Sequence, residues 1–318
     1  MVATGQEPIR QRVGIAIRGK TARQALALIR QAEADGVATA WMTMTATGLD
    51  TPTLFAAAAV ETAQINLGTA IVPAFTRHPL ALASQGLVLG ELAPGRIRLG
   101  IGTSHGPTMV GAYGLAFQHP LAQLREYLHV LRTALHDGRV TFAGTYYQVD
   151  ARLPAASPIP VLISALRERA FELAGELSDG AISWLCPPNY LIDRAIPAMT
   201  RGAEQGGHPA PPLVANIMVA LSPDRDAVRA AARQQLAGYG RLPFYANMFA
   251  EAGFPVGEHG ALSDALLDQI VVSGDDTAIL NQLRALLRRG LDELLVGLVT
   301  LPGQEHAEEQ LMRLLGRI

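Results

Sequence analysis

A glycine-rich segment that also carries hydroxyl and imidazole side chains is the part of this sequence best suited to chemistry. It reads Gly95-Arg-Ile-Arg-Leu-Gly-Ile-Gly-Thr-Ser-His-Gly106, a short apolar run followed by a glycine-rich loop. The glycines let the backbone turn sharply and approach a ligand closely. Thr103, Ser104 and His105 supply hydrogen-bond donors, acceptors and a proton carrier. A turn that needs only glycines would not require Ser104 and His105, so we interpret the segment as a ligand-binding loop.

The loop resembles a dinucleotide-binding fingerprint at first sight. Gly100-Ile-Gly102-Thr-Ser-His-Gly106 has one residue more than the pattern G-x-G-x-x-G. The sequence also predicts no clear helix between this loop and Pro120, so a phosphate would have no helix N-terminus on which to rest. These two departures argue against a dinucleotide-binding domain.

The same residues also satisfy G-x-S-x-G, the nucleophile elbow of α/β-hydrolases, with Ser104 as the nucleophile. Asp275 or Asp292 and then His306 follow in the required order. However, an elbow must lead directly into a helix, which the sequence does not predict after Gly106. His306 is better explained as a solvated residue at the start of the last helix. A serine hydrolase is therefore a distant alternative.

Composition restricts the class of partner. The chain has 318 residues, of which 49% are hydrophobic, and a formal net charge of -2. The single cysteine, Cys186, excludes an intramolecular disulfide, and His129 and His136 have no third ligand for a metal. No segment sustains about 18 apolar residues without a charge, and no signal peptide is evident. We expect a cytoplasmic protein that binds small molecules and copies of itself, but neither nucleic acid nor a membrane.

Strand-like apolar runs alternate with stretches of helical period almost from end to end, which predicts a (β/α)8 TIM barrel. The loop described above would end the fourth strand, with its N–H groups and hydroxyls facing a bound cofactor. The predicted strands are Val13–Arg18, Thr39–Thr43, Ile65–Val72, Arg96–Ile101, Val161–Ala165, Ala181–Leu185, Val214–Leu221 and Glu293–Val299. The predicted helices are Ala22–Ala34, Thr53–Ala63, Leu80–Leu92, Leu121–His136, Arg167–Leu177, Tyr190–Glu204, Arg225–Leu236 and Glu305–Leu315.

Two segments interrupt this alternation. Residues 139–149 alternate with period two around Ala143-Gly144, which predicts a hairpin insertion at about 138–150. Residues 238–290 form too long a connection for a plain barrel and are expected to cover its mouth, with helices near Leu262 and Ala278. We expect one domain over residues 1–318.

Several segments give the chain a family resemblance. Asn66-Leu-Gly-Thr-Ala-Ile-Val-Pro-Ala-Phe-Thr-Arg-His-Pro79 is similar to the strand-to-helix signature of luciferase-like flavin and deazaflavin oxidoreductases, the luciferase-like monooxygenase superfamily. The segments that resemble its actinobacterial branch, which uses coenzyme F420, are Gly95–His105, Arg125–Leu128, Leu173–Gly180 and Ser183-Trp184. The resemblance implies a TIM barrel with insertions that holds the deazaflavin ring at its C-terminal mouth and forms a homodimer.

The resemblance also implies a set of cofactor-binding residues. Residues 70–72 match a strand-end bulge that has a non-prolyl cis peptide behind the ring, and residues 102–105 match the loop beside the cofactor. Residues 164–169 match a phosphate-binding turn, in which close relatives have Gly-Pro where this chain has Arg167-Glu168; either Arg167 or Arg169 would offset the charge of Glu168. The implied cofactor-binding residues are Ala70, Ile71, Val72, Gly102, Thr103, Ser104, His105, Ala165, Leu166, Arg167 and Arg169.

The expected proton carrier differs from that of related dehydrogenases. Several of them have Asp-His at the end of the second strand, where this chain has Trp41-Met-Thr-Met-Thr45. His105 occupies the position of their glutamate acid/base and is the candidate catalytic residue. The candidate residues of the substrate pocket are Trp41, Thr43, Trp184 and Tyr245.

The resemblance implies an oxidoreductase in which coenzyme F420 exchanges a hydride with a small organic substrate such as an imine, an enone or an alcohol. An FMN-dependent monooxygenase of the same fold is one alternative. A non-redox binding protein, or an enzyme without a cofactor, on the same barrel is another, because Arg167-Glu168 and the missing Asp-His both depart from the family pattern.

Overall fold

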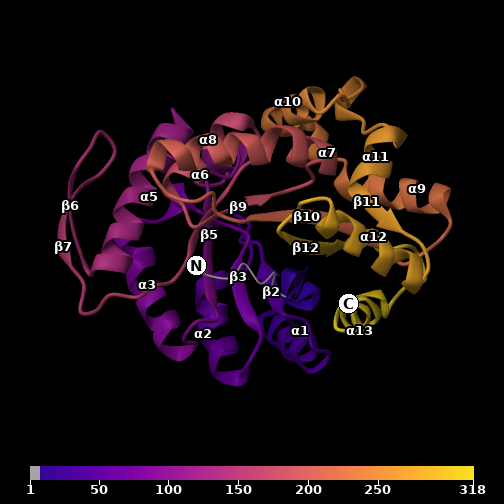
Figure 1. The fold of residues 1–318 in the computed structure, drawn as a ribbon, viewed down its shortest axis with the longest axis horizontal. Helices are drawn as coiled ribbons and strands as arrows, with labels where there is room; N and C mark the ends of the chain where they lie inside the picture. Colours follow the sequence, from indigo (N-terminus) through magenta and orange to yellow (C-terminus); the bar gives the residue numbers. More distant parts are fainter. Residues whose placement is uncertain (1–7) are drawn as a thin grey trace.

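The computed structural model describes residues 8–318, which form a closed barrel of parallel strands surrounded by helices (Figure 1). Neighbouring strands pair in the order β1, β2, β3, β5, β8, β9, β10 and β12, and β12 pairs again with β1. The predicted (β/α)8 fold is therefore confirmed. The barrel strands are β1 (Val13–Ala16), β2 (Thr39–Met42), β3 (Asn66–Thr69), β5 (Ile97–Gly102), β8 (Val161–Ser164), β9 (Gly180–Ser183), β10 (Leu213–Ala220) and β12 (Glu293–Leu298).

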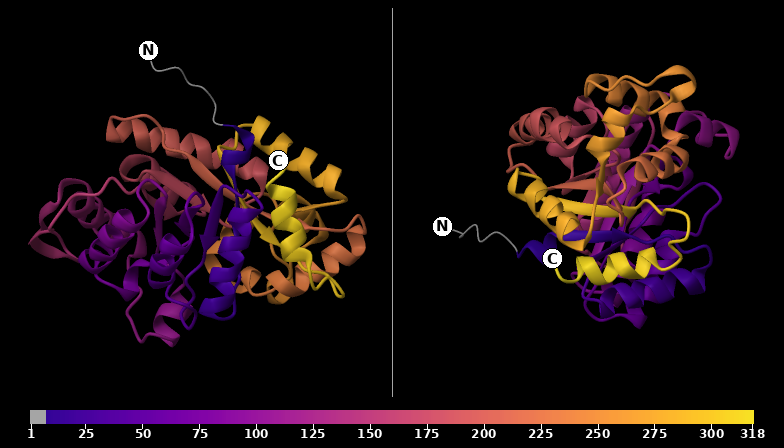
Figure 2. Two further views of the ribbon diagram at one scale, coloured as in Figure 1. Left: turned by 90° about the horizontal axis from the view of Figure 1, so that it is seen from below. Right: turned by 90° about the vertical axis from the view of Figure 1, so that its right-hand side faces the viewer.

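Helices form the outer layer, and several begin at a side chain that accepts a hydrogen bond from the first turn. Thr21, Asp50 and Asp275 each cap a helix in this way. The last helix packs beside the first, which closes the layer (Figure 2). Within residues 8–318, no helix has both the length and the apolar character to cross a membrane. The helices of this layer are α1 (Ala22–Ala34), α2 (Thr51–Glu61), α3 (Pro79–Leu92), α5 (Pro120–Asp137), α6 (Glu168–Leu177), α8 (Ile196–Gly206), α9 (Arg225–Leu236), α12 (Asp276–Arg288) and α13 (Ala307–Leu315).

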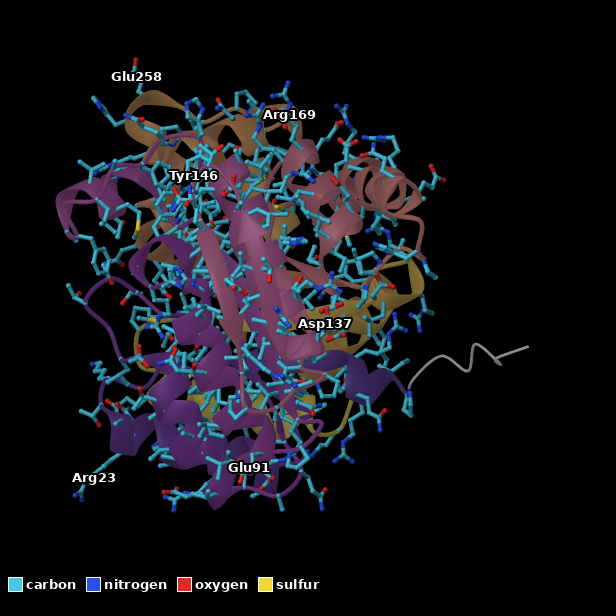
Figure 3. The ribbon with its side chains drawn as sticks, turned by 90° about the vertical axis from the view of Figure 1, so that its left-hand side faces the viewer. Arg23, Glu91, Asp137, Tyr146, Arg169 and Glu258 are labelled. Carbon is cyan, nitrogen blue, oxygen red and sulfur yellow. The ribbon has the colours of Figure 1, made fainter. Side chains whose placement is uncertain are left out.

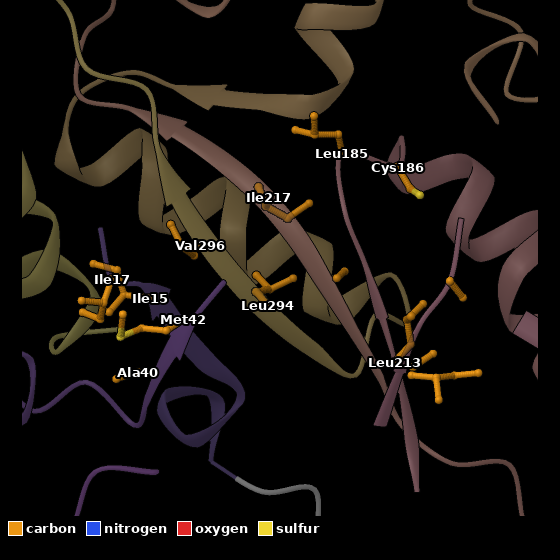
Figure 4. Packing of buried hydrophobic residues seen from close by; sticks show 14 of the residues in the cluster. Ile15, Ile17, Ala40, Met42, Leu185, Cys186, Leu213, Ile217, Leu294 and Val296 are labelled. Carbon is orange, nitrogen blue, oxygen red and sulfur yellow. The ribbon is translucent and has the colours of Figure 1, made fainter. Parts of the chain in front are cut away.

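The space between strands and helices is filled by one large apolar cluster. Ile15, Ile217 and Val296, on three barrel strands, belong to it (Figure 4). All eight residues of β10 are buried, as expected for a parallel strand covered on both faces. This burial explains why the strands are recognisable in the sequence as near-continuous apolar runs.

A second, smaller cluster, built around Trp41, packs side chains from β2, β8, β9, β10 and β12 together. Trp41 is 1% exposed, and added Cβ atoms at Gly14 and Gly68 would lie 2.7 and 2.3 Å from its ring. Arg98 lies over the indole, 4.9 Å from the ring centroid, and forms hydrogen bonds of 2.5 and 2.9 Å with Glu293. Glycine at two neighbouring strands thus makes room for the indole.

The structure differs from the sequence-based prediction just after β5. A short helix, α4 (Gly106–Gly111), begins at Gly106, so our expectation that no helix starts between the glycine loop and Pro120 was wrong. The side chain of Met109 is fully buried, and its N–H donates to the carbonyl oxygen of His105. Burial of this one apolar side chain accompanies a helix that the glycine-rich sequence did not indicate.

The segment at the mouth is shorter than predicted. It comprises η4 (Tyr239–Arg241), α10 (Pro243–Glu251), η5 (Glu258–Gly260), α11 (Asp264–Ile270) and the short strand β11 (Val271–Ser273), which pairs with β10. The helix near Ala278 is α12, which contacts β12 and α13 and so belongs to the outer layer. The insertion therefore ends before α12.

A two-stranded hairpin projects from the barrel wall (Figure 1, left). It consists of β6 (Arg139–Ala143) and β7 (Gln148–Arg152), which pair antiparallel as the period-two alternation indicates. Glu126 on α5 accepts three backbone hydrogen bonds from residues 145–147, at 2.8, 2.7 and 3.1 Å. This carboxylate fixes the hairpin loop to the helix.

Candidate active site

A cavity of about 580 Å³ lies at the C-terminal ends of the barrel strands, where catalytic sites of such barrels are found. Its lining comes from the segments that follow β2, β3, β5, β8 and β9, and from the mouth segment. Most of the residues that the sequence indicated meet here. Those that line the cavity are Thr43, Ala70, Ile71, Thr103, Ser104, His105, Leu166, Arg167, Arg169, Trp184 and Tyr245.

Four of the expected site residues do not line the cavity. Trp41 fills the barrel interior, as described above, so the structure does not support its assignment to the substrate pocket. Val72, Gly102 and Ala165 are buried in the strand ends behind the cavity wall. Alternate residues of a strand face opposite sides, so neighbours in the sequence are divided between wall and core.

One wall is formed where the third strand is interrupted. The Ala70–Ile71 peptide bond is cis, as the resemblance implied, and it separates β3 from β4 (Val72–Pro73). The hydroxyl of Thr43 donates a hydrogen bond of 2.7 Å to the carbonyl oxygen of Ala70. The N–H of Met44 donates to the carbonyl oxygen of Ile71 at 3.2 Å. The segment after β2 therefore holds this bulge from one side.

The loop after β5 forms the adjoining wall. An added Cβ at Gly102 would lie 2.1 Å from Oγ of Ser164, so glycine is needed for β5 and β8 to approach each other here. Ser104 has φ 59°, an uncommon conformation for a residue with a side chain. Both Ser104 and Ser164 line the cavity.

The imidazole of His105 has a ring nitrogen that is available to a ligand. Its Nδ1 atom is buried and has no hydrogen-bond partner within the described residues. Its ring lies beside that of Tyr245, with centroids 5.6 Å apart. Burial lowers the pKa of His105, because the charged imidazolium loses solvation. At neutral pH the imidazole is therefore uncharged.

The mouth segment contributes an aromatic wall that the sequence indicated only in part. The indole N–H of Trp184 donates to the hydroxyl of Tyr239 at 3.1 Å, and the rings of Tyr239 and Tyr245 are 4.8 Å apart. Leu242 and Phe244 line the cavity beside them. Burial raises the pKa of Tyr245 well above its usual value, so its phenol remains neutral.

Other lining residues were not among the candidate site residues, and most of them lie in the loop after β2 or near the ends of α4, α5, α6 and α9. They are Met44, Thr45, Ala46, Thr108, Pro120, Leu121, Ser164, Ala170, Ile182, Gln235 and Gly238. Ser164 is the last residue of β8 and Ile182 the last but one of β9, whereas the predicted strands extended to Ala165 and Leu185. The residues in loops and at helix ends have no sequence pattern that marks them as lining residues.

A turn rich in charged residues leads into α6. Arg167 forms an ion pair with Glu251 of α10, and Glu168 forms ion pairs with Arg194 and Arg201. The charge of Glu168 is therefore offset by arginines other than the two we expected. Arg169 lines the cavity and forms no ion pair with the described residues. The N-terminus of α6, with Arg169 beside it, can receive an anionic group.

The residues of the alternative hydrolase site do not meet. Asp275 caps α12, and Asp292 accepts a hydrogen bond of 2.9 Å from the N–H of Leu213, near the start of β10. His306 is 81% exposed and lies 3.7 Å from Glu309. None of these three residues lines the cavity that contains Ser104. Within residues 8–318, no group of three or more potential ligands could hold a metal ion.

A family model and individual relatives both match this chain. The family model described as luciferase-like monooxygenase matches residues 4–293. An uncharacterized protein of Mycobacterium tuberculosis is 33% identical over 215 residues, which cover 62% of this chain and 63% of that protein's length. A protein of Intrasporangium calvum named F420-dependent glucose-6-phosphate dehydrogenase is 32% identical over 267 residues, which cover 79% of this chain and 78% of that protein.

Solved structures agree on the fold. The coenzyme F420-dependent tetrahydromethanopterin reductase of Methanopyrus kandleri has a TM-score of 0.77 at 22% identity, with 96% of each chain covered. An F420-dependent secondary alcohol dehydrogenase has a TM-score of 0.78 at 18% identity, with 95% of this chain and 97% of that chain covered. An oxygenating component of 3,6-diketocamphane monooxygenase from Pseudomonas putida, in complex with FMN, has a TM-score of 0.72 at 19% identity, with 96% of each chain covered.

Proposed function

Because the chain belongs to the luciferase-like monooxygenase family, we propose that it uses coenzyme F420 to exchange a hydride with a small organic substrate. The observation that carries this proposal is the relative named F420-dependent glucose-6-phosphate dehydrogenase, at 32% identity over 79% of the chain. The proposed substrate carries an imine, enone or alcohol group.

The cavity fits a deazaflavin with an anionic tail. Its volume of about 580 Å³ lies in the range typical of cofactor and ligand sites. Its anion-binding corner consists of the α6 N-terminus and Arg169, and the buried Nδ1 of His105 lacks a partner elsewhere in the wall. When bound, the deazaflavin supplies two-electron hydride transfer.

In this proposal the residues of the chain bind, orient and supply a proton. Residues 70–71 and 103–105 hold the ring, with Val72 and Gly102 behind them, and the turn at residues 166–169 receives the phosphate-bearing tail. The aromatic wall excludes water. His105 would hold or release a proton at Nδ1, next to the reacting carbon or heteroatom of the substrate.

The test is a fluorescence titration of the purified protein with oxidised coenzyme F420 and, separately, with FMN. Saturable binding of F420 at micromolar concentration supports the proposal. The variant Arg169→Ala should weaken F420 binding roughly tenfold, because a charge-assisted contact with the anionic tail is lost. Arg241→Ala is the matched control. Arg241 is an arginine like Arg169, but it belongs to the mouth segment and does not line the cavity.

A second candidate is an FMN-dependent monooxygenase, because the camphane monooxygenase that contains FMN shares the fold. Arg169 and the α6 N-terminus would suit the FMN phosphate equally well. Binding of FMN alone in the same titration would favour this candidate. Binding of neither cofactor would favour a non-redox protein on the same barrel.

We also propose that the protein is a homodimer through α2 and α3. These two helices pack side by side, and Val60, Val88 and Leu92 on them are 67%, 52% and 39% exposed. They are three of the four large apolar side chains exposed in residues 8–318. Exposed apolar side chains on adjacent helices are the observation that supports this proposal.

A further inference from the structure

We propose that the substrate of this site is uncharged and largely apolar, so that sugar phosphates and carboxylates are excluded. This inference rests on the proposed use of coenzyme F420. It is carried by the distribution of charge and hydrogen-bonding groups around the cavity. Arg167 and Arg169 are the only side chains with a permanent charge that line it, and no aspartate, glutamate or lysine does so in residues 8–318.

Both arginines lie in one corner, at the turn that leads into α6. Arg167 is already paired with Glu251, with distances of 2.7 Å from Nε and 2.5 Å from Nη2 to the same carboxylate oxygen. Arg169 remains for the anionic tail of the coenzyme. Once the coenzyme is bound, no cationic side chain is left to receive a second anion. A phosphate or carboxylate on the substrate would then lose its hydration without gaining a partner.

The wall formed by the mouth segment supports the same conclusion. The side chains that line this part of the cavity are four aromatic rings and one branched alkyl group, those of Trp184, Tyr239, Phe244, Tyr245 and Leu242. The hydroxyl of Tyr239 is engaged by the indole N–H of Trp184, so this part of the wall provides mainly apolar contact. Apolar and aromatic substrates gain free energy by leaving water for such a surface.

Two polar side chains of the lining are committed to the protein itself, whereas the hydroxyls of Thr45, Ser104, Thr108 and Ser164 form no hydrogen bond with the described residues. The hydroxyl of Thr43 donates to the carbonyl oxygen of Ala70 at 2.7 Å. The amide of Gln235 donates to the carbonyl oxygen of Thr300 at 2.7 Å and accepts from its N–H at 3.3 Å. These free hydroxyls are uncharged, so they can bind a neutral polar group but cannot neutralise a phosphate or carboxylate. The lining therefore suits an uncharged substrate with a polar group next to His105.

The test uses protein saturated with oxidised coenzyme F420. The oxidised coenzyme has no hydride to transfer, so a bound enone is not reduced. Benzalacetone and its para-carboxylate derivative share a skeleton and differ by one negative charge. Isothermal titration calorimetry should show benzalacetone binding at least about tenfold more tightly than the carboxylate, because only the carboxylate must lose its hydration uncompensated. Glucose 6-phosphate should show no saturable binding.

A variant that is expected to gain binding complements this test, because partial unfolding of the protein could explain weaker binding but not stronger binding. Leu242→Arg places a cation in the apolar wall and should strengthen binding of the carboxylate probe about tenfold. Leu242→Met, the neutral control, should keep the preference for benzalacetone. Circular dichroism spectra of both variants confirm that they are folded.

The outcomes separate this inference from the proposed function. If F420 binds, three results overturn the proposed substrate class but leave the proposed function intact. They are equal or tighter binding of the carboxylate, saturable binding of glucose 6-phosphate, and binding of neither enone. Absence of F420 binding in the titration that precedes the experiment overturns the proposed function, and this inference with it.

Discussion

Arg167 and Glu251 join the start of α6 to the end of α10 across the cavity mouth. Two guanidinium nitrogens of Arg167 contact one carboxylate oxygen, and the other oxygen of Glu251 accepts a hydrogen bond of 3.2 Å from the hydroxyl of Tyr190. The pair is 84 residues apart in the sequence. It places a carboxylate beside the turn at which we propose that the anionic tail of the coenzyme binds.

Glu251→Gln should therefore strengthen coenzyme binding. Removing the carboxylate frees Arg167 to pair with the phosphate and removes a repulsive charge, so Kd for F420 should fall roughly threefold to tenfold. Fluorescence titration measures the change. Glu258→Gln is the matched control, because Glu258 is exposed at the same end of the molecule as Arg169 (Figure 3) and forms no ion pair within the described residues. An unchanged or higher Kd in Glu251→Gln would contradict the prediction.

His105 should determine one limb of the pH profile. Burial lowers its pKa below the usual value of about 6.5, and within the described residues no carboxylate lines the cavity to raise it again. In the oxidative direction the neutral imidazole accepts a proton, so kcat/KM should fall as pH drops through this lowered pKa and stay flat above it. In the reductive direction the protonated imidazole donates the proton, so kcat/KM should fall as pH rises through the same pKa. His105→Gln should remove the limb, whereas His306→Gln, at an exposed position outside the cavity, should keep it. A limb that persists in His105→Gln would assign the proton to another group.

The regular part of the fold was predictable because burial on both faces leaves a simple pattern. The strand β10, Leu213–Ala220, is apolar apart from Asn216, and all its residues are buried. Short elements lack such a pattern. The helix α4 begins with Gly106-Pro107, and β11 has only three residues, whose pairing with β10 is a tertiary contact.

The site was predictable as a set of strand ends but not as a set of contacts. Trp41 and Thr43 both belong to the second predicted strand, yet Trp41 fills the barrel interior and Thr43 lines the cavity. The interior has room for the indole because Gly14 and Gly68, on two other strands, have no side chain. The Arg167–Glu251 pair has no local signal at all, since packing of α10 over the mouth brings its two residues together.

Thr43→Val tests the hydrogen bond that holds the third-strand bulge. The two side chains have nearly the same shape, so the change removes chiefly the donor to the carbonyl oxygen of Ala70. We expect the free energy of unfolding to fall by about 1 kcal/mol and F420 binding to weaken. Urea denaturation and fluorescence titration measure the two effects. Thr133→Val is the control and should change neither, because the Thr133 hydroxyl forms no hydrogen bond with the described residues and Thr133, on α5, does not line the cavity.

Gly68→Ala tests the packing of the barrel interior. The added Cβ would lie 2.3 Å from two ring carbons of Trp41, so the indole or the strand must shift. We expect the free energy of unfolding to fall by about 1–3 kcal/mol. Gly111→Ala, at a position with no atom within 4 Å of the added Cβ, should cause no loss. Chemical denaturation of both variants measures the free energy of unfolding. Equal values for the two variants would contradict the prediction, because they would show that the barrel interior accommodates the added methyl group without cost.

Val88→Asp tests the proposed dimer. A carboxylate in the apolar surface of α2 and α3 would be buried without a partner in the assembly, so the variant should dissociate to a monomer. Sedimentation velocity at several concentrations measures the change. Val110→Asp is the matched control, because Val110 is 57% exposed, close to the 52% of Val88, but lies on α4. It should remain a dimer. A monomeric wild-type protein, or dissociation of Val110→Asp as well, would show that α2 and α3 do not form the interface.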